Sequence, residues 1–173
     1  LELEPSYATA RQWYGEMLAA MRRTDEALEQ LDIAARLDPK SVIITHVKGW
    51  ILLGAGRYAE AEKQYAIALP MGPESGIILS NMEILYLLTG QYERAKRFAM
   101  RAGDALGYDP AVSILIADAL QNPGLLPRAV EAVLGMDELP EGSLWKGLYL
   151  MILDQRELAL SSLETGFEAG DPY

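Results

Sequence analysis

Apolar residues recur at the spacing of an amphipathic helix along the chain, in segments that end at glycine or proline. After Ser41, apolar side chains return every three or four residues over positions 42–52 and stop before Gly56, where glycine can end a helix in the left-handed conformation. A second helical pattern over residues 57–69 ends at Pro70, because proline cannot continue a helix. No segment shows the strict alternation of a strand. The pattern therefore predicts pairs of helices joined by short turns.

These helix pairs recur with a fixed period. An alanine anchors the second helix of each of the first four pairs, and neighbouring anchors are 34 residues apart: Ala27, Ala61, Ala95 and Ala129. A fifth anchor, Ala159, follows after 30 residues. A period in this range indicates stacked supersecondary units. The predicted repeats, which together form one domain, span about 6–39, 40–73, 74–109, 110–140 and 141–173.

The chain opens with LELEP, which matches ARLDP at residues 35–39, the end of the first repeat. We therefore expect that the sequence is a piece of a longer repeat protein. Terminal repeats of such arrays need polar outer faces. Neither end of this sequence shows an obvious one, so the sequence also allows self-association of the chain.

The second repeat carries the residues that suggest a family. Counted from Val42 as the first position, the eighth, twentieth, twenty-fourth and thirty-second positions hold Gly49, Ala61, Tyr65 and Pro73. Small residues, an aromatic residue and proline in this order resemble the tetratricopeptide repeat. The resemblance implies an all-α fold, a right-handed α-solenoid of about five helix-turn-helix repeats. Two departures from the family pattern are Glu83 at the eighth position of the third repeat and the irregular turn QNPGLLP at residues 121–127.

A narrower resemblance concerns the two ends of the sequence. LELEPSYATARQWYGEMLAAM and the closing GDPY look like the C-terminal repeat regions of bacterial winged-helix transcriptional regulators or nucleotide cyclases. This resemblance implies a module of a signalling or transcription regulator whose output domain lies outside the sequence. A cytoplasmic location is favoured, and a periplasmic one is left open for a membrane-bound parent protein.

Charge and composition restrict the partners. With 15 Lys and Arg against 25 Asp and Glu, the formal net charge is −10, which repels a phosphate backbone and argues against direct nucleic-acid binding by this segment. An apolar or basic protein or peptide is the expected partner. The apolar runs at residues 42–44 and 114–116 are far too short to cross a bilayer, so no membrane insertion is expected.

The sequence offers little material for catalysis. It contains one histidine, His46, and no cysteine, so neither a catalytic triad nor a histidine- or cysteine-rich metal site can be assembled. Acidic pairs such as Asp25-Glu26 suit the starts of helices, where carboxylates complement the helix dipole. We therefore expect no enzymatic activity, no metal and no cofactor.

The resemblance also implies a binding surface. In tetratricopeptide arrays the first helices of successive repeats line a concave groove, and this implies that Gln12, Glu16, Ile43, His46, Trp50, Leu53, Ile77, Ser80, Ile84, Leu87 and Asp118 line it here. Its middle is apolar, which is typical of an interaction site. The alternative is that Trp50 and Ile84 belong to the core between helices. The lysine, asparagine and arginine clamp of chaperone-binding members is absent, so an acidic C-terminal peptide is disfavoured.

The predicted function is therefore a non-enzymatic protein-interaction scaffold that binds a peptide or helix in this groove. A sensor that binds a small molecule or lipid in the same groove is the alternative. Trp50 and Ile84 are the residues on which both hypotheses depend.

Overall fold

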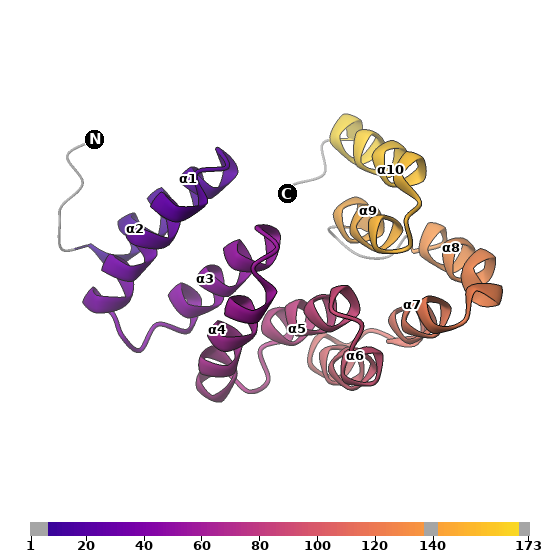
Figure 1. Cartoon of the computed structure of the whole chain (residues 1–173), viewed down its shortest axis with the longest axis horizontal. Helices are drawn as coiled ribbons and strands as arrows, with labels where there is room; N and C mark the ends of the chain where they lie inside the picture. Colours follow the sequence, from indigo (N-terminus) through magenta and orange to yellow (C-terminus); the bar gives the residue numbers. More distant parts are fainter. Residues whose placement is uncertain (1–6, 137–141, 170–173) are drawn as a thin grey trace. The chain divides into compact units, whose positions relative to one another are not determined.

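The structure is a computed structural model that describes residues 7–136 and 142–169. Over these residues it has ten α-helices, one 3-10 helix and no strand (Figure 1). The helices are α1 (Ala8–Ala20), α2 (Thr24–Leu37), α3 (Val42–Gly54), α4 (Tyr58–Met71), α5 (Gly76–Leu88), α6 (Tyr92–Leu106), α7 (Ala111–Gln121), η1 (Pro123–Leu125), α8 (Leu126–Leu134), α9 (Gly142–Ile152) and α10 (Arg156–Ala169). The chain divides into two compact units, Leu1–Leu85 and Tyr86–Tyr173.

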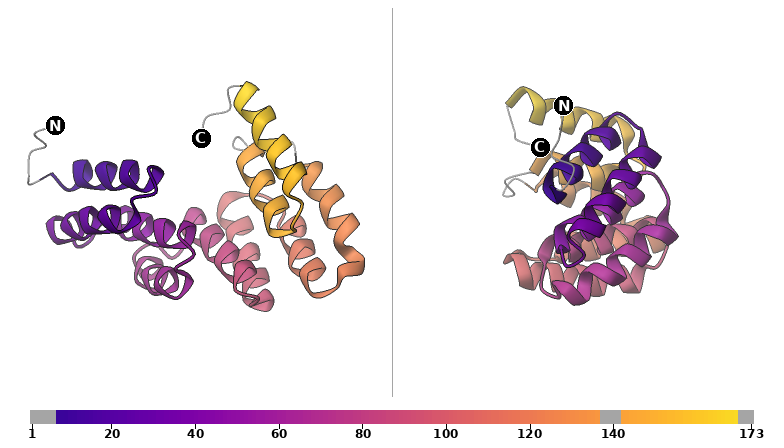
Figure 2. Two further views of the ribbon diagram at one scale, coloured as in Figure 1. Left: turned by 45° about the horizontal axis from the view of Figure 1, so that its top comes forward. Right: turned by 90° about the vertical axis from the view of Figure 1, so that its left-hand side faces the viewer.

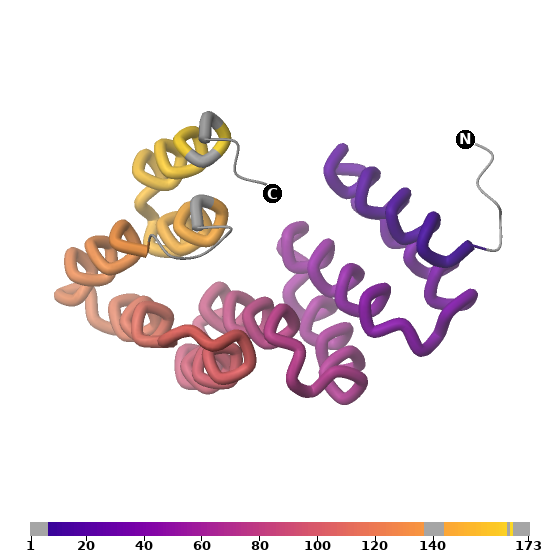
Figure 3. Tube along the Cα trace, turned by 180° about the vertical axis from the view of Figure 1, so that it is seen from behind, coloured from indigo at the N-terminus to yellow at the C-terminus, as the bar shows by residue number. Residues whose placement is uncertain are grey.

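Helical hairpins are the building blocks of both units. In the first unit α1 packs on α2 and α3 on α4 (Figure 2). In the second unit α7 packs on α8 and α9 on α10 (Figure 3). The rings of Tyr86 on α5 and Phe98 on α6 lie 5.4 Å apart between centroids. This contact shows that α5 and α6 also pack on each other. The predicted pairing of helices is thus confirmed.

Small residues let the two helices of a hairpin approach closely. A Cβ atom added to Gly49 would lie 2.7 Å from Cε1 of Tyr65, and one added to Gly147 would lie 2.8 Å from Cγ of Leu163. The anchor alanines are fully buried, with an exposed fraction of 0% for Ala27, Ala61, Ala95, Ala129 and Ala159. These small residues therefore have a packing role, because a larger side chain would push the helices apart.

The turn within four of the five hairpins uses a left-handed residue at one repeat position. Positive φ angles occur at Arg22 (60°), Gly56 (73°), Gly90 (71°) and Asp154 (57°). The next N–H then bonds to the carbonyl five residues earlier, as from Arg57 N to Leu52 O at 2.9 Å. This is the bond of a Schellman motif, which closes the end of the first helix. The glycine stop expected at Gly56 is confirmed.

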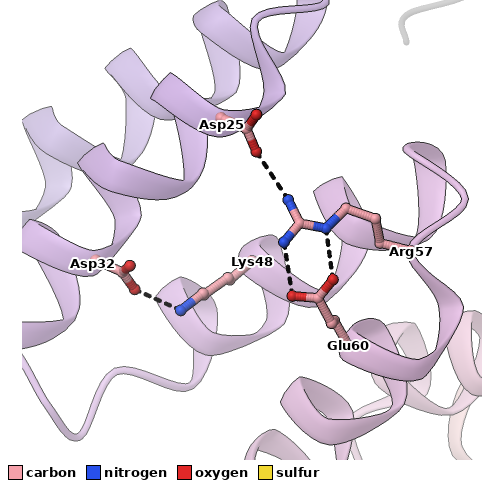
Figure 4. Close-up of polar contacts among 5 residues, drawn as sticks. All are labelled: Asp25, Asp32, Lys48, Arg57 and Glu60. Atoms are coloured by element: carbon pink, nitrogen blue, oxygen red, sulfur yellow. Dashed lines mark hydrogen bonds and ion pairs between the residues drawn. The ribbon is translucent and has the colours of Figure 1, made fainter.

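Ion pairs tie the second hairpin to the first (Figure 4). Lys48 Nζ on α3 lies 2.5 Å from Asp32 Oδ1 on α2. Arg57, at the turn before α4, donates from Nη1 to Asp25 Oδ1 at 3.0 Å. Its Nε and Nη2 donate to the two carboxylate oxygens of Glu60, both at 2.7 Å. Together with the packing of α3 on α1 and α2, these pairs define the register of the two hairpins.

The two departures from the repeat pattern have local structures. Glu83, at the position of a small residue, is buried with an exposed fraction of 1%. The expected irregular turn between α7 and α8 forms the 3-10 helix η1, where the side chain of Asn122 accepts a hydrogen bond from Gly124 N at 3.2 Å. The fourth repeat therefore keeps its helical pair despite the altered turn.

The close contact at Gly49 yields a matched pair of variants. Gly49→Ala places a methyl group against the ring of Tyr65, which is fully buried, and should lower the free energy of unfolding by about 1 to 3 kcal/mol. Gly54→Ala, on the same helix with nothing within 4 Å of its added Cβ, should leave stability unchanged or raise it, because alanine favours the helix. Urea titrations of both variants measure the difference. Equal losses would contradict the close-approach explanation.

Candidate functional site

An exposed apolar stripe follows α3. Ile43, His46 and Trp50 are three and four residues apart and therefore share one helix face. Ile43 and Trp50 are largely exposed, at 61% and 52%, and His46 is partly buried. The helix that carries them begins at Ser41, whose hydroxyl accepts a hydrogen bond from Ile44 N at 3.3 Å. Exposed large apolar side chains on one helix face make this face a candidate interaction surface.

The equivalent stripe on α5 differs in burial. Ile77, which corresponds to Ile43, is 56% exposed. Ser80 and Ile84 are buried, at 5% and 2%. Leu53, at the end of α3, is also buried, at 8%. Of the predicted groove residues on these two helices, Ile43, Trp50 and Ile77 are thus open to a partner, whereas Leu53, Ser80 and Ile84 are packed.

A hydrogen bond joins the middle of the α3 stripe to α5. Nε2 of His46 lies 2.8 Å from Nδ2 of Asn81, so the amide donates to a neutral imidazole. Burial lowers the pKa of His46 below its ordinary value, which agrees with a neutral ring, and burial raises the pKa of the nearby Tyr65 hydroxyl. No local signal in the sequence identifies Asn81 as the partner of a histidine 35 residues away.

The remaining predicted residues lie on α1, near the end of α5 and on α7. On α1, Gln12 is buried at 9% and donates from Nε2 to Glu16 Oε1 at 2.9 Å. In the second unit, Leu87 is buried at 3%. Asp118 Oδ1 on α7 forms an ion pair with Lys96 Nζ on α6, at a distance of 2.6 Å. The assignment of the full set to partner binding stays a prediction, and the exposed core of the candidate site is Ile43, Trp50 and Ile77.

Within residues 7–136 and 142–169, no three His, Cys, Asp or Glu side chains could together hold a metal ion. None of the described helices is long and apolar enough to cross a bilayer. Two shallow hollows, one between α7 and α8 beside Leu115 and Arg128 and one at the turn before α10, contain none of the predicted groove residues.

Comparison with known proteins identifies the repeats. Residues 15–76 match the family model described as tetratricopeptide repeat. These residues reach from within α1 to the first residue of α5, so this part of the chain is similar to tetratricopeptide repeats. No curated protein sequence matches the chain.

Solved structures share the tetratricopeptide fold. YrrB, a tetratricopeptide protein described as having an unusual peptide-binding site, is 20% identical, with a TM-score of 0.58 over 94% of this chain and 86% of that one. PilW, a type IV pilus biogenesis factor, is 24% identical, with a TM-score of 0.63 over 98% and 80% of the two chains. MamA from Desulfovibrio magneticus RS-1 is 18% identical, with a TM-score of 0.63 over 93% of each chain.

These findings confirm the predicted fold class, an all-α solenoid of tetratricopeptide repeats. Tetratricopeptide repeats are in general non-enzymatic interaction modules, and stacked repeats present extended surfaces for binding.

Trp50 and Ile84 occupy the same position in neighbouring repeats but differ in burial, and this difference can be measured. Ile84→Asn should lower the free energy of unfolding by about 2 to 5 kcal/mol, because it places an amide in a packed site. Trp50→Gln should change it by about 0.5 kcal/mol or less, as is usual at exposed positions. Thermal melts of the two variants check both values. A large loss for Trp50→Gln would assign this side chain to the core.

The burial of His46 predicts a pH-dependent stability. The unfolded chain takes up a proton near the ordinary pKa of 6.5, whereas the folded chain has a lower pKa at this site. Stability should therefore decrease as the pH falls below 6.5 and level off below the folded pKa, because the unfolded state binds the proton more readily. Melting temperatures of wild type and His46→Gln, compared from about pH 7.5 to about pH 5.5, isolate the contribution of this group. Parallel curves would show that the pKa of His46 is not lowered by folding.

Proposed function

We propose that the chain is a non-enzymatic protein-interaction scaffold that binds an apolar or basic peptide or amphipathic helix at the stripe on α3 and α5. The observation that carries this proposal is the exposure of Ile43, Trp50 and Ile77, at 61%, 52% and 56%. Tryptophan is among the residues that most often dominate binding energy at interfaces. Trp50 is accordingly the expected anchor.

The net charge of −10 supports the preference for a basic partner, because it attracts cationic segments and speeds their encounter. Val47 and Ile77 stand where clamp residues of chaperone-binding members would be. This composition disfavours an acidic C-terminal peptide. The peptide-binding site ascribed to YrrB gives the same fold a binding role of this kind.

For the parent protein, we propose a bacterial signalling or transcription regulator. The support for this context is the resemblance of the opening and closing segments, LELEPSYATARQWYGEMLAAM and GDPY. Sequencing the complete gene tests it directly. A winged-helix or cyclase domain on the same chain is the expected result, and an unrelated domain would contradict it.

Binding can be tested with a panel of synthetic peptides that combine apolar residues with lysine or arginine. Trp50→Ala should weaken the best peptide by about 2 kcal/mol, or about thirtyfold in Kd, measured by fluorescence polarisation. Trp13→Ala is the matched control, because Trp13 is an exposed tryptophan, at 61%, on another helix. Equal effects of the two variants would contradict the proposed site.

The same variants distinguish the scaffold from the alternative function, a sensor of small molecules or lipids. A small-molecule or lipid sensor would bind vesicles or apolar dyes in a manner that depends on Trp50 and would show no peptide binding. Binding of peptides without binding of vesicles supports the scaffold.

A further inference from the structure

A titratable side chain lies in the middle of the exposed stripe on α3. His46 comes three residues after Ile43 and four before Trp50, so the three side chains share one helix face. Ile43 and Trp50 are largely exposed, and His46 is partly buried. The hairpin that carries them has a neighbouring hairpin on each side within the sequence. A partner that covers both Ile43 and Trp50 must therefore also cover the imidazole ring.

The contact of His46 with Asn81 depends on the charge of the ring. Nε2 of His46 lies 2.8 Å from Nδ2 of Asn81. Because an amide nitrogen can only donate, Nε2 accepts, and the proton of the neutral ring lies on Nδ1. Asn81 is held in place on α5 with an exposed fraction of 8%. The hydrogen bond between α3 and α5 therefore requires the neutral form of His46.

Protonation reverses the polarity of this contact. An imidazolium ion has N–H donors on both ring nitrogens, so its Nε2–H would meet the N–H donors of the Asn81 amide. The contact can form again only if the carboxamide of Asn81 turns over and offers Oδ1 in place of Nδ2. The positive charge nevertheless stays on the ring, between Ile43 and Trp50. Protonation thus places a charge in the middle of an apolar surface.

The groups that meet the ring from α4 and α5 are neutral. The ring of Tyr65 on α4 lies 6.3 Å from the ring of His46 between centroids. Burial raises the pKa of the Tyr65 hydroxyl, so this phenol keeps its proton. On α5 the group in contact is the amide of Asn81, and Glu83, two residues later, lies on another face of that helix. Neither helix supplies a negative charge to balance an imidazolium.

Acids on the two helices before α3 bond to other groups. Asp32 of α2 pairs with Lys48, and Glu16 of α1 accepts a hydrogen bond within its own helix. Among the residues that the structure describes, no charged side chain contributes to the pKa of His46, which burial lowers. A partner that covers the ring would bury it further and favour the neutral form more strongly.

We propose that His46 is a pH switch of the α3 face: a cationic partner binds while the ring is neutral and is released when the ring takes up a proton. The inference rests on the proposed function, because it concerns the same surface and the same basic partner. The imidazolium repels the lysine or arginine side chains of the partner. Its burial under the partner also removes the water that stabilises the charge. By linkage, the bound partner makes the ring harder to protonate.

NMR spectroscopy tests the switch without a partner. The sequence has one histidine, His46, and two asparagines, Asn81 and Asn122, so their side-chain signals can be assigned. The Hε1 resonance of His46 gives the pKa of the ring, and the side-chain amide resonances of Asn81 should change with the same midpoint. Those of Asn122 are the control, because Asn122 bonds to the backbone N–H of Gly124, which does not titrate. Asn81 resonances that stay constant while His46 titrates would overturn the switch.

Peptide binding measures the effect of the proton on the surface. The probe is the tightest-binding peptide of leucine and lysine from the panel, with blocked ends, so that it does not titrate near neutral pH. Its Kd, measured by fluorescence polarisation, should be constant above the pKa of His46 and increase by up to about tenfold for each pH unit below it. His46→Gln is the matched control, because its amide takes up no proton, and its Kd should not change over the same range.

Asn81→Asp tests the direction of the switch. A carboxylate beside the ring stabilises the imidazolium, so the pKa of His46 and the pH at which the peptide is released should both move upward. The NMR signal of His46 and the fluorescence polarisation measure the two quantities separately. A release that does not follow the pKa of His46 would contradict the role of this residue.

The outcomes separate the switch from the proposed function. A Kd that increases in acid for wild type but not for His46→Gln supports the switch. A wild-type Kd that stays constant, or that changes equally in His46→Gln, overturns the switch and leaves the proposed function intact. A chain that binds no peptide of the panel at about pH 7.5 overturns the proposed function and the switch with it.

Discussion

The close approach of two helices at a small residue is the constraint on which the rest of the structure depends. At Gly49 the backbone of α3 lies directly against the ring of Tyr65, and the anchor alanine of each second helix is fully buried. Because this close approach recurs at Gly15, Gly49 and Gly147, equivalent positions of these hairpins are expected to point in the same direction relative to their own hairpin.

Residues at the same repeat position can nevertheless differ in burial, and the apolar residues that stay exposed form the candidate functional surfaces. Trp50 and Ile84 share one repeat position, yet the first is exposed and the second is buried. Trp13 and Val47 share another and differ in the same way. The position within the repeat therefore does not decide burial by itself. Large apolar side chains at uncovered positions then have free energy to gain from a partner.

Polar contacts give the stacking its register. The pair of Arg57 with Asp25 is exposed and that of Lys48 with Asp32 is partly buried, and ion pairs near the surface add little to stability. Their effect is on specificity, since a hairpin placed in another register would lose them. The contact of His46 with Asn81 lies deeper, where a polar group without a partner would be costly.

The sequence by itself determined the helices, the period, the glycine turn at Gly56 and the small residues of the hairpins, because these follow from local patterns that repeat along the chain. It also predicted the exposed stripe in part, through Ile43, Trp50 and Ile77. Only the tertiary structure decided that Ile84 is packed and that His46 meets Asn81. Burial and long-range hydrogen bonds depend on which hairpin lies next to a residue, and spacing along one helix does not contain that information.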